Sequence, residues 1–497
     1  MTWNYVVKNF NDFWLSLGLI IIVSVIIFAS KILQNNAGEG QSFPGPSKYL
    51  GVGTLLTYGR FLYMGIPEAS TYYLNRYGDV VHVWVCGEPT LVTSNPTVAR
   101  HILKSNGNNY TSRLGYDIGL DHIGMFNNGI IWNNNTNHWK SLRTFFQNAL
   151  NAKTLNAAIK ASAASTNDMI GKLDDLRRRT TEGKIETLNV LRRITLQVTN
   201  LLMFGVKIDN DERLVELIVE YFKAWEYFLI RPWYFYLPTS TFKKHKKPVK
   251  ELKDACMEIV QRKKQQLDSV SFKQIENPNF LECLLHAVER DEITEENVYQ
   301  CVLEMLLAGT DTSSVSMYYT LVALSDDAQV EREIVKELKA VSLEDESTDR
   351  KLLTQLVCLE NTLKESMRIK PVGPVVLRRA LKDDNINGVP IRSGTNVVLS
   401  LVDMHRRSDL FEDPTSFVPH RFKSEKTNEN FYPFGTGPKG CVGQFLAMVE
   451  MKVILGVLLK KFQFRSVVGK LSDVTTRWDI ANQPTDASYM IIEERRD

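Results

Sequence analysis

The feature that most constrains this chain is a glycine-rich loop, FYPFGTGPKGCVG at residues 431–443, followed at once by an apolar segment predicted to be a helix, Phe445–Phe462. Gly435, Gly437 and Gly440 have the GxGxxG spacing of a dinucleotide-binding loop. That loop, however, needs a strand before it and an acidic residue about 20 positions later. Here Phe-Tyr-Pro-Phe precedes the glycines and a proline interrupts them. A nucleotide-binding loop is therefore disfavoured, and a tight turn before a helix remains.

The cysteine in this turn gives the turn its chemistry. Backbone amides of a glycine-rich loop can surround the sulfur of Cys441, and the helix that follows places its N-terminus beside it. Amides and the positive end of a helix both favour a thiolate in a dry site. A thiolate held in this way can supply the single axial sulfur of a haem iron. We therefore predict that Cys441 is the metal ligand of a haem.

The composition excludes several classes of protein. The 497 residues are 44% hydrophobic and 24% charged, which excludes disordered and fibrous chains. Sixty basic and 57 acidic side chains leave a net charge of +3, so nucleic acid is not expected as a partner. Six scattered cysteines without a CxxC pair disfavour a disulfide framework and structural zinc.

The N-terminal segment is predicted to be a membrane anchor. The 17 residues Phe13–Ala29 carry no charge, and a helix that crosses a bilayer needs about 20 apolar residues, with 17 as the lower limit. A cleaved signal peptide is the alternative, but little basic charge precedes the apolar core and no small-residue cleavage site follows it. We expect residues 1–33 to form the anchor, residues 34–46 a linker with a proline-rich hinge, and residues 47–497 one haem-binding domain.

The hydrophobic pattern predicts a mainly α fold with small β-sheets. Long helices are expected at Leu155–Met203, Asp211–Leu229, Lys247–Ser269, Glu295–Leu324 and Phe445–Phe462. Strands are expected in a hairpin at Asp79–Val92 and in a small region at Val389–Val402. The basic run KKHKK at residues 243–247 is interpreted as a solvated loop, with a membrane or partner surface as the alternative.

The segment Ala308–Thr312 lies in a helix that is apolar almost all round and is therefore expected to be buried. Gly309 and the polar pair Asp311 and Thr312 are costly in a buried helix unless they have a function. We predict a local widening that admits dioxygen and water, with Asp311 and Thr312 as catalytic residues that relay protons. The alternative is an ordinary core helix whose hydroxyl groups bond back to its own carbonyls.

Charged residues in two further segments can form a network. Glu365 and Arg368 stand three residues apart on one face of a predicted helix, where they can pair. Arg421, in the segment PHRF, precedes Cys441 by 20 residues and offers a second guanidinium to Glu365.

Taken together, the order of these motifs resembles the cytochrome P-450 family of haem-thiolate monooxygenases. The resemblance covers essentially the chain after Pro44, through the hinge, AGTDT, ExxR, PxRF and FGxGxxxCxG. It implies the cytochrome P-450 fold, a monooxygenase domain with haem b as cofactor, and Cys441 as axial ligand. It also implies a structural network of Glu365, Arg368 and Arg421. The residues that it implies at the haem propionates are Arg113, Trp139, Arg143, Arg378 and Lys439.

Within that family, several segments are similar to the aromatase subfamily, whose members convert androgens to oestrogens. They include YGDVVHVWVCG at residues 77–87 and NVYQCVLEM at residues 297–305. The resemblance implies a flat apolar steroid as substrate and places Arg193 in a proton network near Asp311. The substrate-pocket residues that it implies are Ile131, Trp132, Trp225, Ala308, Asp311, Thr312, Val372, Val375 and Leu377.

Departures from the subfamily fall where substrate would sit. Thr310 stands where aromatases usually carry a proline that bends the helix. Gly373 and Pro374 replace bulkier and acidic residues, and Ala481–Pro484 lacks the Ser/His pair expected near the steroid.

The resemblance implies successive oxidations of androstenedione and testosterone with dioxygen and electrons from NADPH. It also implies NADPH–cytochrome P-450 reductase as partner, membrane lipid around the anchor, and an endoplasmic reticulum location with the catalytic domain in the cytosol. The departures leave open a steroid or sterol hydroxylase that does not aromatise. A third alternative, a haem-thiolate isomerase or lipid-binding protein that needs no reductase, is disfavoured by the acid–alcohol pair Asp311 and Thr312.

Overall fold

The structure is a computed structural model that describes residues 43–47, 52–178, 183–206, 208, 210–231, 235–267, 275, 277–343, 349–478, 480–485 and 488–495. The expected membrane anchor, residues 1–33, lies outside these ranges, as does most of the expected linker. Among the helices of the described ranges, none is both long and apolar enough to cross a bilayer.

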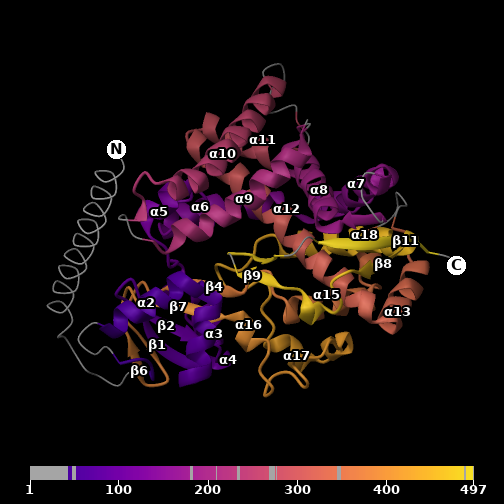
Figure 1. The fold of residues 1–497 in the computed structure, drawn as a ribbon. Coiled ribbons are helices and arrows are strands. Elements are labelled where there is room, and N and C mark those ends of the chain that lie inside the picture. The colour runs from indigo at the N-terminus through magenta and orange to yellow at the C-terminus, as the bar shows by residue number, and fades with distance from the viewer. Residues whose placement is uncertain are drawn as a thin grey trace, which may run out of the picture.

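Helices form most of the described chain (Figure 1). The α-helices are α2 (Val52–Met64), α3 (Ile66–Tyr77), α4 (Pro96–Arg100), α5 (Asp117–Ile123), α6 (Thr136–Ala149), α7 (Ala152–Arg178), α8 (Thr187–Thr199), α9 (Asp211–Leu229), α10 (Ser240–Leu267), α11 (Phe280–Glu289), α12 (Glu295–Asp326), α13 (Ala328–Lys339), α14 (Arg350–Leu353), α15 (Val357–Ile369), α16 (Leu401–Met404), α17 (Glu425–Glu429) and α18 (Gln444–Lys461). Short π turns are η2 (His101–Ser105) and η5 (Asn200–Phe204), and short 3₁₀ turns are η3 (Gly107–Tyr110), η8 (Pro419–Lys423) and η9 (Leu471–Asp473).

The strands form small separate sheets. The largest has the order β1 (Val80–Val85), β2 (Glu88–Thr93), β7 (Asn396–Ser400) and β4 (Val375–Arg379), with β2 and β7 parallel and the other pairs antiparallel. A second sheet has the order β3 (Lys184–Glu186), β11 (Tyr489–Glu494) and β8 (Phe462–Ser466). Two-stranded sheets pair β5 (Asp384–Ile386) with β6 (Val389–Ile391), and β9 (Thr476–Trp478) with β10 (Asn482–Pro484).

Helix α12 runs through the middle of the helical part and packs against α8, α10, α15 and α18 (Figure 1). Its start is fixed by a capping box, in which Thr294 and Asn297 satisfy each other's backbone amides. Gly309 allows α8 to approach closely, because a Cβ at this position would lie 2.6 Å from Thr199 Oγ1. The predicted buried helix is therefore confirmed, and its glycine serves helix packing.

The structure confirms most of the expected elements and corrects two. The hairpin at Asp79–Val92 is β1 and β2, and the predicted helices at 211–229, 295–324 and 445–462 are α9, α12 and α18. The single helix expected over Leu155–Met203 was wrong, because this stretch contains α7, strand β3, α8 and η5. Gly183 has φ of 66°, which no helix continues through, and Ile185 beyond it pairs with Met490 of β11.

The basic run at residues 243–247 also differs from its expected form as a loop. It lies within α10, which begins at Ser240 rather than at Lys247. The helix can start earlier because the ring of His245 stacks on Tyr227 at 4.5 Å and the ammonium of Lys246 lies 5.3 Å from the centroid of Phe242. The four lysines of the run are nevertheless exposed, as expected for a solvated segment, so only the predicted loop form is corrected.

Candidate active site

A cavity of about 420 Å³ lies between α12 and the loop that carries Cys441. Most of the predicted pocket residues line it, and they come from four separate segments of the chain. Those that line it are Ile131, Trp132, Trp225, Ala308, Thr312, Val372, Val375 and Leu377, together with Cys441. The mostly apolar lining and the single cysteine thiol suit a large apolar ligand beside a metal-containing cofactor.

The loop before Cys441 is a tight turn, as predicted. Gly435 and Gly437 have φ of 62° and 73°, a conformation that strains any residue with a Cβ. At Gly437 a Cβ would also lie 1.7 Å from the backbone oxygen of Leu103 in η2, so the loop needs glycine to seat against this turn. The Cys441 amide donates to the Phe434 oxygen at 2.8 Å, which closes the loop.

The surroundings of the Cys441 thiol have opposing effects on its pKa. Burial raises the pKa of this thiol, whereas the Gly443 amide and the guanidinium groups of Arg143 and Arg113 lower it. Arg143 is fixed beside the loop because its Nη2 donates to the Gly440 oxygen at 2.7 Å. Amide and guanidinium groups are what an anionic sulfur requires.

Cationic side chains surround the part of the cavity next to this loop. Arg113, Arg143, Arg378 and Lys439 all line it. Burial, and then the charges of nearby Arg113 and Arg378, lower the pKa of Lys439 to about 6. Burial likewise holds the pKa of Arg378 well below its usual range. Buried cations this close together require an anion to compensate them.

Two buried donors in the same region point to such an anion. Arg113 Nε and Trp139 Nε1 find no hydrogen-bond partner within the described part of the chain. Trp139 is not among the cavity-lining residues, but its ring lies 4.1 Å from Lys439 Nζ and 5.6 Å from Arg143 Cζ. The propionate groups of a haem would supply the missing acceptors and the missing negative charge, so the residues present fit that cofactor.

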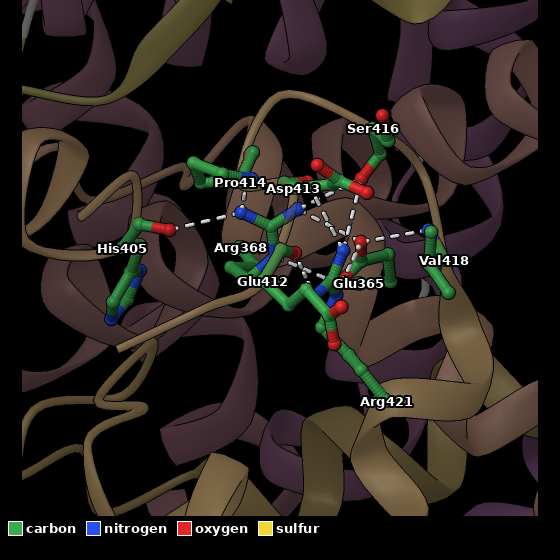
Figure 2. A network of polar contacts seen from close by, with 9 residues as sticks. All are labelled: Glu365, Arg368, His405, Glu412, Asp413, Pro414, Ser416, Val418 and Arg421. Carbon is green, nitrogen blue, oxygen red and sulfur yellow. Dashed lines mark hydrogen bonds and ion pairs between the residues drawn. The ribbon is translucent and has the colours of Figure 1, made fainter. Parts of the chain in front are cut away.

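Glu365, Arg368 and Arg421 form one ion-pair network (Figure 2). Both Glu365 oxygens accept from Arg368, at 2.8 Å each, and Arg421 Nε donates to Glu365 Oε1 at 3.0 Å. Glu365 and Arg368 are completely buried. Arg368 also donates to the backbone oxygens of His405, Pro414 and Ser416. The network therefore joins α15 to the irregular segment that leads to the cysteine loop.

His405 continues this connection and was not among the residues singled out in the sequence. Its Nε2 accepts from the Tyr432 amide at 3.2 Å, at the start of the cysteine loop. Burial, and then the charge of Arg368, lower the pKa of His405 to about 3. The imidazole is therefore neutral at physiological pH, as an acceptor at Nε2 must be.

The hydroxyl group of Thr312 opens onto the cavity from α12. Its Oγ1 donates to the Ala308 oxygen at 2.6 Å, and Ser316 Oγ donates to the Thr312 oxygen at 2.9 Å. The back-bonding that the core-helix alternative expects is thus present, yet Thr312 faces the cavity rather than the core. Farther along, Ser313 hydrogen-bonds to Glu450 of α18, a cavity-lining carboxyl whose pKa burial raises to about 8.

Asp311 occupies a different place from the one expected. It is completely buried and is not among the residues that line the cavity. Its Oδ1 accepts from Arg192 Nε at 2.8 Å, and its Oδ2 accepts from the Gln483 amide. Arg192 Nη2 also donates to Gln483 Oε1 at 2.6 Å, which closes a three-residue network. The expected placement of Asp311 in the substrate pocket is therefore corrected.

The prediction of which arginine lies beside Asp311 is also corrected. Arg193, which was expected beside Asp311, pairs instead with Asp211 at 3.0 Å near the surface. The preceding residue, Arg192, takes the buried position. Successive residues of a helix point about 100° apart, so only one of two neighbouring arginines on α8 can face α12.

Comparison with known proteins decides the family. The sequence model of cytochrome P450 matches residues 43–490. The chain belongs to the cytochrome P450 family. Its similar relatives include aromatases from Gallus gallus (38% identical, covering 94% of this chain and 91% of that protein), Taeniopygia guttata (39%, 94% and 90%) and Mus musculus (36%, 94% and 92%). A solved structure described as a zebra fish cytochrome P450 with abiraterone has a TM-score of 0.72 at 21% identity, covering 86% of this chain and 98% of that one.

Membership of the cytochrome P450 family makes this protein an oxidoreductase, a monooxygenase that uses haem iron and receives electrons from a redox partner. The solved structure is similar in fold and supports the helix-rich architecture alone.

The sequence analysis did not predict four residues of the site: Arg192, Gln483, His405 and Glu304. A charged residue inside an apolar helix was a usable signal for Glu304.

Proposed function

We propose that this cytochrome P450 is an aromatase-type enzyme that converts androstenedione and testosterone to oestrogens by successive oxidations. The observation that carries the proposal is the match to aromatases at 36–39% identity over about nine-tenths of both chains. The mostly apolar cavity beside Cys441 supports it, because a steroid is a flat apolar molecule of the size that such a cavity accepts.

Each group of residues has a role in this reaction. Cys441 would ligate the haem iron, and Arg113, Trp139, Arg143, Arg378 and Lys439 would hold the haem propionates. When bound, the haem supplies the binding of dioxygen and the oxidation chemistry. The chain itself orients the substrate, excludes water and moves protons.

The cavity walls orient the substrate. Trp132 and Trp225 meet edge to face, with ring centroids 5.3 Å apart, and form one wall. Val372, Val375 and Leu377 come from the segment after α15 and line the cavity with them. These rigid apolar side chains favour a flat ring system and leave few polar groups to bind a competing polar molecule.

Thr312 transfers protons at the cavity, whereas Asp311 does not line the cavity and has a structural role. Thr312, whose hydroxyl group donates to the Ala308 oxygen, lines the cavity, as do Ser313 and Ser316 farther along α12. Both oxygens of Asp311 are engaged by Arg192 and Gln483, so contact with a substrate ketone would require this network to open. Asp311 is therefore a positioning residue that fixes α12 against α8.

A steroid or sterol hydroxylase is the second candidate, and two observations favour it. Thr310 stands in α12, which remains helical from Glu295 to Asp326. Gly373 lines the cavity and presents no side chain to a substrate. An enzyme with this pocket that bound steroids in another orientation would hydroxylate them and leave the A ring intact.

The remaining expectations are part of the same proposal. Residues 1–33 would anchor the enzyme in the endoplasmic reticulum membrane, and NADPH–cytochrome P-450 reductase would deliver electrons. The segment Phe13–Ala29, with 17 uncharged residues, supports the anchor.

Turnover of the full-length protein tests the proposal. We would reconstitute it in membranes with a reductase and NADPH, add androstenedione or testosterone, and identify products by mass spectrometry. Oestrone and oestradiol are expected, and Cys441→Ala should form neither. Hydroxylated androgens with an intact A ring would favour the hydroxylase instead.

A further inference from the structure

Glu304 is a buried carboxyl group whose surroundings differ from those of the other acidic residues on α12. It is 1% exposed and lines the cavity one helical turn before Ala308. Within the described ranges, no lysine or arginine forms a salt bridge with it. Burial raises the pKa of Glu304, while hydrogen bonds from the Ile130 amide, the Gln300 side chain and the Ile131 amide, and the charge of nearby Arg113, lower it. Its principal partners are therefore backbone amides.

These amides belong to a short segment beside α12, Gly129–Trp132, which we call the strap. Glu304 Oε2 accepts from the Ile130 amide at 2.7 Å, and both oxygens lie 3.2 Å from the Ile131 nitrogen. Gln300 Nε2 donates to Glu304 Oε1 at 3.2 Å and orients the carboxyl group. Amide bonds to a carboxylate are charge-assisted and stronger than bonds between neutral groups.

The strap has no regular secondary structure that could satisfy these amides. Buried backbone donors must find an acceptor, and Glu304 provides it for two successive residues. Ile130, Ile131 and Trp132 line the cavity, and the indole of Trp132 donates to the Leu114 oxygen at 3.0 Å. The strap thus forms one wall of the substrate cavity, and it is tied to α12 through Glu304.

Gly129 shows how closely the carboxyl group and the strap fit. A Cβ at this position would lie 2.2 Å from Glu304 Oε1 and 2.6 Å from Oε2, and its three nearest atoms all belong to the Glu304 carboxyl group. The backbone at Gly129 does not require positive φ. The glycine is therefore explained by the approach of Glu304 alone.

We propose that Glu304 is a positioning residue: its carboxyl group holds the strap Gly129–Trp132 as a wall of the cavity and so sets the affinity for the substrate. The role in holding the strap does not depend on which substrate is turned over. The effect on affinity rests on the proposed function, because a steroid is the probe.

Hydrogen exchange of the full-length holoprotein measures the strap directly. Glu304→Gln should speed exchange of the Ile130 and Ile131 amides by about tenfold, because the glutamine side chain keeps one acceptor oxygen, presents its NH2 group to a donor and loses the charge-assisted bond. Glu296→Gln is the matched control, since exposed Glu296 accepts from the side chain of Asn128 next to the strap at 3.1 Å. This control should leave exchange unchanged.

A double-mutant cycle isolates the contact between Gly129 and Glu304. Gly129→Ala alone should speed exchange of the strap, because the new methyl group collides with the carboxyl group. In a Glu304→Ala background the same change should add little, because the colliding atoms are gone. Additive effects of the two substitutions would contradict the proposed contact.

Affinity provides a readout that a purely structural role would not change. Androstenedione binding, followed by the absorbance shift of the haem, should weaken by about tenfold in Glu304→Gln, the consequence of about one lost hydrogen bond at the wall, while haem content stays at the level of the unaltered protein. Unchanged strap exchange in Glu304→Gln would overturn the proposal. Faster strap exchange with unchanged affinity for androstenedione would overturn the proposed effect of Glu304 on substrate affinity. Failure of the unaltered protein to bind androstenedione would instead count against the proposed function, and strap exchange would still decide the role of Glu304.

Discussion

Arg192 Nε lies 2.8 Å from Asp311 Oδ1, in an ion pair that joins α8 to the helix above Cys441. Asp311 is completely buried and Arg192 nearly so. Gln483, which belongs to strand β10, contacts both members of the pair. Three segments that are distant in the sequence therefore contact one another outside the cavity, and these contacts fix the position of α12.

Breaking this pair should destabilise the protein strongly. Arg192→Met leaves Asp311 buried without its guanidinium, a change that typically costs about 3–5 kcal/mol. Arg193→Met is the matched control, because its pair with Asp211 is partly exposed and should contribute about 0–1 kcal/mol. Urea unfolding of the holoproteins, followed by haem absorbance, compares the two. Equal losses in free energy of unfolding would contradict the assignment of Arg192 as the buried partner.

Thr312→Ala should uncouple electron use from product formation. The Thr312 hydroxyl faces the cavity, and its loss should lower product formation by roughly a hundredfold, the lower end of what a proton-transfer group contributes. Ser316→Ala, one turn along α12, removes a hydroxyl that donates to the Thr312 oxygen and should have little effect. Product formed per NADPH oxidised is the measurement, and Thr312→Ser should restore much of it. If Thr312→Ala formed as much product per NADPH oxidised as the unaltered protein, the Thr312 hydroxyl group would have no role in proton transfer.

Glu365→Gln should prevent accumulation of the holoprotein. The substitution leaves Arg368 with no carboxylate and removes a partner from Arg421, at a cost of about 3–5 kcal/mol for a buried pair. The yield of haem-containing protein, measured from its thiolate-ligated spectrum, tests this. Arg421→Lys should be milder, because it keeps a cation beside Glu365. A full yield of Glu365→Gln would show that the network is dispensable.

His405 makes stability depend on pH in the acid range. Its folded pKa of about 3 lies below the ordinary value of 6.5, so the unfolded chain takes up the proton first and stability falls as pH drops from 6.5 towards 3. Each pH unit in this range costs about 1.4 kcal/mol for one proton. His405→Gln keeps an acceptor for the Tyr432 amide and should lower the pH slope of the unfolding free energy by about one proton. An unchanged slope would show that His405 does not bind the proton on unfolding.

The sequence predicted the parts of the site that local motifs define. The turn before Cys441 follows from its glycines and the apolar helix after it, and the pairing of Glu365 with Arg368 follows from their spacing on one helix face. Similarly, α12 was predicted because nearly all of its faces are apolar. Each of these features depends on residues that are neighbours in the chain.

The parts that were missed depend on how distant segments meet. Arg192 and Arg193 are adjacent on α8, and only the packing of α8 against α12 decides which of them reaches Asp311. Gln483 lies 172 residues from Asp311 in the sequence, and no local pattern connects them. The single helix expected over Leu155–Met203 failed for the same reason, because β3 forms only through its pairing with β11.

The fate of one methyl group tests the central claim most directly. Aromatase-type turnover removes the methyl carbon between the A and B rings of the androgen, whereas hydroxylation retains it. We would supply androstenedione labelled with carbon-13 at this methyl group to the reconstituted full-length protein, and follow the label by mass spectrometry. The account predicts unlabelled oestrone and the label in a released one-carbon acid. Label retained in a hydroxylated steroid with an intact A ring would contradict it.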